Sequence, residues 1–238
     1  MVWIAGVDGC RGGWIAVFRH VARGDLVWGL YERFADILDA PEWPKIIAVD
    51  MPIGLLDAAA PGGRGPEKLL RRRLAPAGRA SCVFTPPVRR ALAASTYSEA
   101  LRINHRSSPQ RIGISRQSFG LFVKLRELDA LISPRLQGRV REAHPEFAFL
   151  CMNGGSAIPA PKKTSAGFAR RAALLRRHGF GALIAAARKI PRKFAGPDDV
   201  LDAAAVCWTA LRLLRGEAVV LRAHSPRDSR GLKMEVCG

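Results

Sequence analysis

The chain has 238 residues, a length that suits one large domain or one domain with a sizeable insertion. Its hydrophobic fraction of 48% is enough for a buried core, and no segment approaches the roughly 18 uncharged apolar residues of a membrane span. Lysine and arginine total 38 against 20 acidic residues, so the formal net charge is +18. This surplus predicts a polyanionic partner, nucleic acid above all, and a solvated basic surface is the alternative.

The start of the chain and its cysteines bear on the cellular compartment. No basic region, apolar stretch or small-residue cleavage site precedes the first predicted strand, so we expect no export signal and a cytoplasmic location. The five cysteines are scattered and form no Cys-x-x-Cys, which predicts neither a disulfide framework nor a zinc site. No membrane partner is expected, and a homodimer stays open.

The first fifty residues predict three strands, a short helix and a fourth strand. An apolar run at 3–9, a glycine-rich turn and a second run at 14–18 indicate a hairpin. A strand at 25–31, a helix at 33–40 and a strand at 45–50 follow. This order, β-β-β-α-β, is characteristic of ribonuclease H-like sheets and of the related actin-like ATPase halves.

The remainder predicts a helical insertion at about 52–138 within a single domain spanning 1–238. After the insertion we expect a fifth strand at 140–150, whose Pro145 favours an edge strand or a bulge. The other predicted elements are helices at 117–132, 164–188 and 198–215, a short strand at 218–221 and a polar tail. The predicted fold class is therefore α/β, a ribonuclease H-like mixed sheet with the order β-β-β-α-β-[helical insertion]-β-α and helices on both faces.

Two acidic residues close apolar runs near the start of the chain. Asp8 and Asp50 each come where a predicted parallel strand leaves the sheet. If the two strands are neighbours, both carboxylates lie at the edge where α/β sheets collect ligands, close enough to share a cation. The alternative is that each aspartate only starts an Asx-type turn.

The last predicted helix supplies further carboxylates. Asp199 and Asp202 are three residues apart and therefore share one face of its first turn. We expect Asp198 to cap the helix and Asp199 to favour its dipole, but neither role explains Asp202, which apolar residues flank. Clustered carboxylates stay ionised together only with cations between them, and oxygen-only ligation suits Mg²⁺ or Mn²⁺.

The predicted fifth strand carries a third group of polar residues. In extended conformation Glu142, His144 and Glu146 share one face, where they could supply a ligand and a general base. Either glutamate could serve, and the alternative is the solvated face of an edge strand.

Several motifs in the same order resemble one known family, domain of unknown function 429, whose members are described as predicted ribonuclease H-like nucleases. The resemblance covers nearly the whole chain and rests on the motifs at 6–14, 49–55, 79–84, 115–117, 141–146, 162–164 and 198–203. It implies a two-metal site for phosphodiester hydrolysis, with Asp8 bridging the metals and Asp50 and Asp202 completing their shells. It implies auxiliary roles for Asp199 and a glutamate of the fifth strand, Glu142 or Glu146. Phosphate contacts are assigned to Lys162, Lys163 and Arg79.

The function that the sequence predicts is a metal-dependent nuclease acting on DNA or RNA. One alternative is an actin-like or sugar-kinase-like ATP-binding protein, but no second β-β-β-α-β unit is visible after residue 150. A second is a catalytically silent nucleic-acid-binding protein with structural acids. A third is hydrolysis of a small nucleotide, against which the net charge of +18 argues.

Overall fold

A computed structural model describes residues 1–187 and 189–238, and the side chains of these residues except 186 and 224–226. The predicted helix end at residue 188 therefore lies outside the described residues. The chain forms two compact units. The first unit contains residues 1–51, 138–220 and 237–238, and the second contains residues 52–137 and 221–236.

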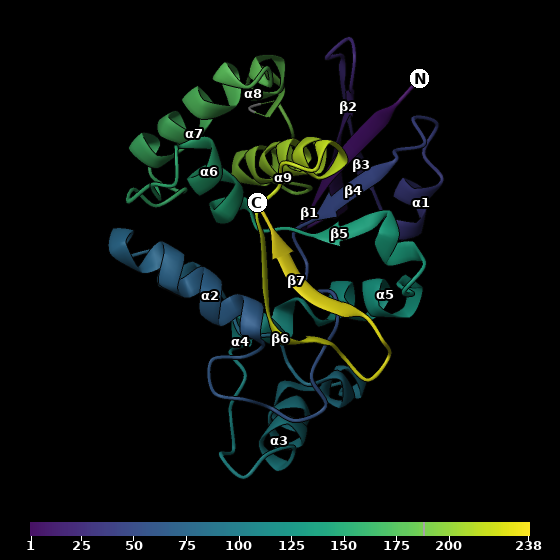
Figure 1. The fold of residues 1–238 in the computed structure, drawn as a ribbon, viewed down its shortest axis with the longest axis vertical. Helices are drawn as coiled ribbons and strands as arrows, with labels where there is room; N and C mark the ends of the chain where they lie inside the picture. The colour runs from purple at the N-terminus through teal and green to yellow at the C-terminus, as the bar shows by residue number, and fades with distance from the viewer. Residues whose placement is uncertain (188) are drawn as a thin grey trace. The chain divides into compact units, whose positions relative to one another are not determined.

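A five-stranded mixed sheet, with strand order β3-β2-β1-β4-β5, organises the first unit (Figure 1). β1 (Trp3–Cys10), β2 (Gly13–His20) and β3 (Leu26–Tyr31) form an antiparallel meander. β4 (Ile46–Val49) pairs in parallel with β1, and β5 (Val140–Glu142) pairs in parallel with β4. The predicted hairpin and the predicted mixed α/β class are confirmed.

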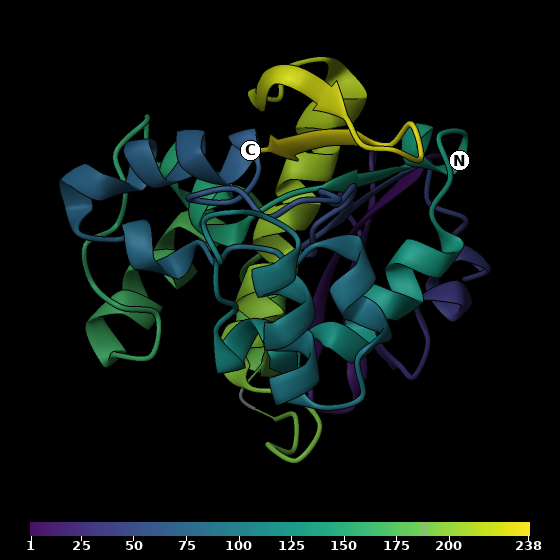
Figure 2. The ribbon, with the colours of Figure 1, turned by 90° about the horizontal axis from the view of Figure 1, so that it is seen from below.

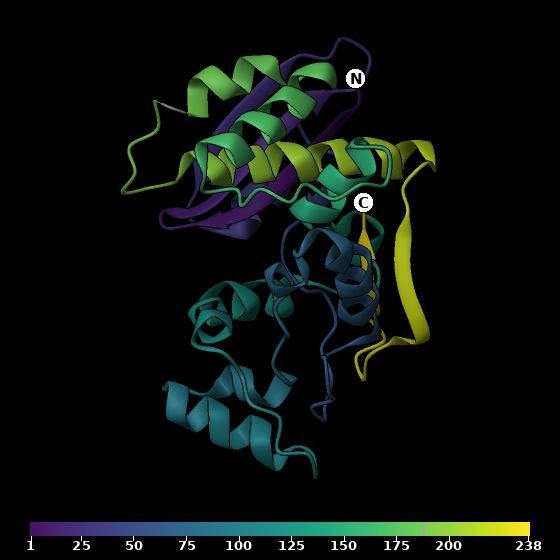
Figure 3. The same cartoon turned by 90° about the vertical axis from the view of Figure 1, so that its left-hand side faces the viewer.

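Helix α9 (Pro197–Arg215) packs against β1, β2 and β4, and Figure 3 shows it crossing the purple strands. The contact with β1 is made through the backbone at Gly6. A Cβ atom at Gly6 would lie 2.1 Å from the backbone nitrogen of Cys207 and 2.2 Å from the carbonyl oxygen of Ala203. Only a glycine therefore allows the helix to lie this close to the strand.

The two faces of the sheet carry different neighbours because side chains alternate along β2. Ile15 belongs to the core beneath α9, whereas Trp14 points to the other face and meets Phe34 edge to face, with ring centroids 5.2 Å apart. Phe34 lies in α1 (Phe34–Leu38), so helices flank the sheet on both faces.

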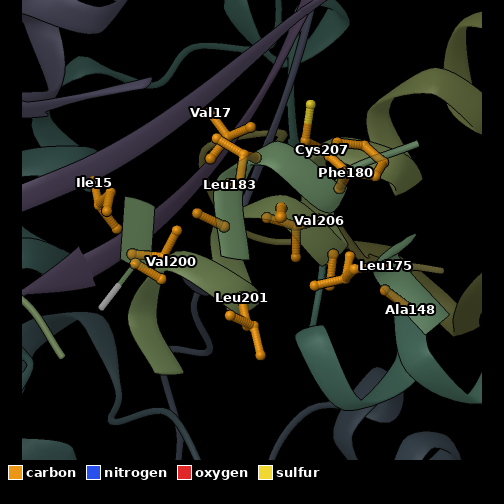
Figure 4. Packing of buried hydrophobic residues seen from close by; sticks show 14 of the residues in the cluster. Ile15, Val17, Ala148, Leu175, Phe180, Leu183, Val200, Leu201, Val206 and Cys207 are labelled. Carbon is orange, nitrogen blue, oxygen red and sulfur yellow. The ribbon is translucent and has the colours of Figure 1, made fainter. Parts of the chain in front are cut away.

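The core on the α9 face is built from α7 (Ser165–Arg177), α8 (Gly181–Ala187) and α9 against β2. Figure 4 shows its side chains, among them Ile15, Val17, Leu175, Leu183, Val200, Leu201 and Val206. The sequence predicted one helix over 164–188. The helix instead ends at Arg177, and Gly179, with a φ of 86°, takes the left-handed conformation between α7 and α8.

The predicted strand over 140–150 is wrong beyond its first three residues. β5 ends at Glu142, and α6 spans Pro145–Met152. Pro145 occupies the first turn of the helix, where its missing N–H costs no hydrogen bond. The side chain of His144 caps the helix by accepting a hydrogen bond from the backbone N–H of Glu146. Glu142, His144 and Glu146 therefore do not share a strand face.

The second unit is helical and carries a hairpin, drawn in yellow in Figure 2. Its helices are α2 (Gly65–Leu74), α3 (Tyr97–Arg106), α4 (Arg116–Gly120) and α5 (Phe122–Leu131), with 3₁₀ turns at Ala75–Ala77, Ala80–Cys82, Arg89–Ala93 and Leu136–Gly138. The helix predicted over 117–132 is thus two helices that meet at Leu121.

The polar tail predicted after residue 221 is also wrong. β6 (Val220–Arg227) pairs with β7 (Lys233–Cys237), and most of both strands lies in the second unit. The carboxylate of Asp228 stabilises the turn between them by accepting backbone N–H groups of Leu232 and Arg230. Within the described residues, no helix has the length and apolar character that crossing a membrane needs.

Candidate functional site

Asp8 and Asp50 lie next to each other in register at the carboxyl edge of the sheet. Val7 pairs with Val49 in the parallel ladder, and the N–H of Asp50 donates to the carbonyl of Val7 at 2.9 Å. Asp8 and Gly6 are two residues apart in β1 and therefore point to the same face of the sheet. That face is the one that α9 covers, so the side chain of Asp8 lies on the α9 side. Asp8 is buried and Asp50 is partly buried.

Helix α9 brings Asp202 to the same edge. Gly196 occupies the N-cap position, and the carboxylate of Asp199 accepts its N–H at 2.7 Å. Asp199 therefore caps the helix, and the expectation that Asp198 does so is wrong. Asp202 lies one turn further on, is only 3% exposed and carries no capping role.

Lys162, which comes from the loop before α7, is the cation of this cluster. Its ammonium group donates to Oδ2 of Asp202 and lies 3.6 Å from Oδ2 of Asp198. The sequence predicted a phosphate contact for Lys162 but gave no sign of this ion pair, since 40 residues separate it from Asp202. Burial opposes the charged form of Lys162, but Asp202 and Asp8 raise its pKa overall.

The carboxylates shift one another's pKa. Burial raises the pKa of Asp50 to about 7, against the lowering effect of Lys162, and Glu146 raises it further. Burial likewise raises the pKa of Asp202 to about 6, despite its bond to Lys162. For Asp8, burial and then the charges of Asp50 and Asp202 hold the pKa well above its usual range. Desolvation and mutual repulsion therefore act on all three groups, which is typical of functional sites.

Glu146 is close enough to act on Asp50 and Asp202, but it has a cation of its own. Both of its carboxylate oxygens accept from one guanidinium nitrogen of Arg171 in α7, at 2.7 and 2.8 Å. Arg171 is 1% exposed, and its other terminal nitrogen donates to the carbonyls of Ala160 and Gly167. The sequence gives no sign of this role for Arg171, because an arginine in an arginine-rich helix is expected to be exposed.

The register separates Glu142 from the aspartates. Glu142 pairs with Val49, so it lies on the sheet face opposite the one that carries Asp50. It is buried. Of the two glutamates left open by the sequence, only Glu146 therefore lies with the aspartate cluster.

The other predicted phosphate contacts are not part of this cluster. Lys163 is exposed next to Lys162. Arg79 belongs to the second unit, at the start of a 3₁₀ turn.

The chemistry of the donor set fits a hard divalent cation, because every candidate ligand is a carboxylate oxygen and one lysine faces several acids. The side chains do not form a closed cage as they lie. Among the residues that the structure describes, no three His, Cys, Asp or Glu side chains form a group that could hold a metal ion.

The fold and the cluster define a mixed α/β protein with buried carboxylates at the carboxyl edge of its sheet. The model of the family described as "Protein of unknown function (DUF429)" matches residues 6–227, and the chain belongs to this family. The family resemblance of the motifs is thereby confirmed. Comparison with curated proteins and with solved structures finds no match for the chain.

Proposed function

We propose that this protein hydrolyses phosphodiester bonds of DNA or RNA in a reaction that depends on Mg²⁺ or Mn²⁺. The observation that carries the proposal is the gathering of Asp8, Asp50 and Asp202 from two strands and a helix into one cluster, in which Asp8 and Asp202 are buried and Asp50 is partly buried. Carboxylates gathered in this way repel one another, and a bound divalent cation would offset their charge.

The sheet supports the finer assignment to the ribonuclease H-like class. Three antiparallel strands are followed by a helix and two parallel strands, and the last long helix covers the face that carries the aspartates. The net charge of +18 supports a polyanionic substrate.

In this proposal Asp8, Asp50 and Asp202 would hold the metal. A bound divalent cation supplies an activated water and stabilises the leaving oxygen of the phosphodiester. Asp199 fixes the first turn of α9, and through it the position of Asp202. Arg171 fixes Glu146 beside the aspartates through two hydrogen bonds.

One observation favours a second candidate, a nucleic-acid-binding protein without catalysis. Lys162 already supplies a cation to Asp202, which is what a purely structural cluster would need. Under the nuclease proposal Lys162 has to leave Asp202 when the metal binds.

The test is cleavage by the metal-free protein after addition of Mg²⁺ or Mn²⁺, with single-stranded, duplex, hybrid and branched substrates. Calorimetry measures Mn²⁺ binding in parallel. We expect Asp8→Asn to abolish cleavage and to weaken Mn²⁺ binding, because it removes a charged oxygen ligand.

Asp39→Asn is the matched control, since Asp39 is exposed at the end of α1 in the same unit. It should leave both readouts unchanged. If no substrate is cut and Asp8→Asn binds Mn²⁺ like the wild type, the nuclease proposal is wrong. Cleavage that is lost equally in both variants would also contradict it.

A further inference from the structure

A groove of about 860 Å³ in the second unit is lined by basic and hydroxyl side chains. One wall is helix α3, which contributes Ser98, Arg102, His105 and Arg106, and the loop after the helix contributes Ser108 and Arg111. The helical residues fall at positions i, i+4, i+7 and i+8, so they share one face of α3. None of the described residues that line the groove is acidic.

Among the residues that the structure describes, the three arginines of the groove have no anionic partner. Within the described part of the chain, the side chains of Arg102, Arg106 and Arg111 take part in no hydrogen bond or ion pair, and all three are exposed. The acid of α3, Glu99, instead accepts the backbone N–H of Ser95 at the start of the helix.

Helix stability does not explain this arrangement. His105 and Arg106 lie in the last turn of α3, where a positive charge complements the helix dipole. That effect does not extend to Arg102 or to Arg111 in the loop. Two like charges at i and i+4 also repel one another, which makes Arg102 beside Arg106 unfavourable without an external anion.

The hydroxyl groups add hydrogen-bond donors to the positive charge. The Oγ atom of Ser108 is buried and has no hydrogen-bond partner. Ser108 is itself one of the residues that line the groove. Arginine and serine donors together are the side chains with which proteins contact phosphate oxygens.

We propose that this groove binds the phosphodiester backbone of a nucleic-acid strand. Arg102 and Arg106 are one turn apart on the same face of α3, about 6 Å along the helix axis, so two cations lie in a row along the groove. Arg111 extends the row, so the groove offers more cations than a single phosphate needs. The assignment rests on the proposed function for its choice of nucleic acid as the source of the phosphates.

The experiment measures binding of a fluorescent single-stranded oligonucleotide by anisotropy, in EDTA and over a range of salt concentrations. The variant is Arg102→Gln with Arg106→Gln. The matched control is Arg72→Gln with Arg73→Gln, which removes the same charge from exposed positions on α2 in the same unit. Circular dichroism and the thermal midpoint check that each variant is folded.

We expect the groove variant to lose at least about tenfold in affinity. Its slope of log affinity against log salt should fall by about 1.4, at about 0.7 for each lost contact on a single strand. The control variant at Arg72 and Arg73 should lose clearly less affinity for the oligonucleotide. Equal losses in both pairs, or no binding by the wild type, would overturn the proposal, because the effect would then be net charge alone or absent.

Two further arms separate the alternatives. Displacement of the oligonucleotide by millimolar inorganic phosphate or a mononucleotide would overturn the strand assignment in favour of a single-phosphate site. Cleavage is measured separately with Mn²⁺. If the groove variant loses binding while the wild type cuts nothing, the groove assignment holds and the nuclease proposal fails.

Discussion

Lys162 and Lys163 are neighbours in the sequence with different surroundings. The ammonium group of Lys162 contacts Asp202, whereas Lys163 is exposed. We expect Lys162→Met to lower the free energy of unfolding of the metal-free protein by about 1–3 kcal/mol, because it leaves a buried carboxylate without its donor. It should also bind Mn²⁺ about tenfold more tightly, which corresponds to about 1.4 kcal/mol, because no ammonium competes for Asp202.

Urea unfolding and calorimetric Mn²⁺ titration, both at pH 8, check these two effects. Lys163→Met is the matched control and should change neither quantity. Weaker Mn²⁺ binding by Lys162→Met would instead mean that this lysine supports the metal-bound state.

The pKa values of Asp50 and Asp202, about 7 and about 6, predict how stability depends on pH. Both lie above the value of about 3.9 for an unfolded aspartate, so the native state binds more protons than the unfolded state in this range. Stability from these groups is therefore complete below about pH 4 and is lost as the pH rises through 6 to 7.

Thermal midpoints in EDTA between pH 4 and pH 8 check this expectation when the wild type is compared with Asp50→Asn. The difference in thermal midpoint between the two proteins at each pH reports the contribution of Asp50, because all other titrating groups are present in both. We expect Asp50→Asn to gain relative stability as the pH rises to 7. A difference that stays constant over the whole range would contradict the assignment.

At the same scale, the sequence predicts some site residues and not others. Asp8 and Asp50 can be predicted because a charged residue ends an apolar run, and Asp202 because it interrupts one. The pairing of Lys162 with Asp202 and of Arg171 with Glu146 depends on how distant segments meet. Neither pairing has a local signal in the sequence.

Among the elements, α6 and α7 are joined by the buried pair of Glu146 and Arg171. We expect Arg171→Met to lower the free energy of unfolding by about 3–5 kcal/mol, because it leaves the carboxylate of Glu146 buried without its cation. Replacing both partners by Glu146→Leu and Arg171→Met should recover much of this loss, since neither charge then remains buried.

Urea unfolding of the single and double variants measures both effects. The exposed pair of Arg33 and Asp36 at the start of α1 provides the control, and Asp36→Ala should change the free energy of unfolding far less than Arg171→Met does. If Arg171→Met lowers the free energy of unfolding no more than Asp36→Ala does, the buried pair is not needed to hold α6 to α7.

The same region shows where sequence patterns fail for an element. Polar side chains recur at every second position in this segment, at Glu142, His144 and Glu146. This period of two is typical of a strand and therefore favours the strand prediction, which is wrong beyond Glu142. Helix α6 is buried on nearly every side, so it has no polar stripe with helical spacing. Pro145 is the one local signal for a helix start, and it is equally compatible with an edge strand.

For the whole molecule, the net charge of +18 makes association with a polyanion sensitive to salt. We expect the affinity for a single-stranded oligonucleotide to fall about 20-fold between 50 and 200 mM NaCl if as few as three phosphates are contacted. Anisotropy titrations at several salt concentrations measure this slope. If the affinity does not change with salt concentration, the protein does not bind nucleic acid through its phosphate backbone. This conclusion does not depend on whether the aspartate cluster is catalytic.

The contact at Gly6 has a consequence for how this protein tolerates change. At Gly6 no side chain separates helix α9 from the backbone of β1, so the approach of the two elements at this point does not depend on the size of an apolar side chain. Apolar residues elsewhere in the core can change in size, at a cost in stability, without filling this point of contact. A side chain at position 6 would instead push apart the strand that carries Asp8 and the helix that carries Asp202.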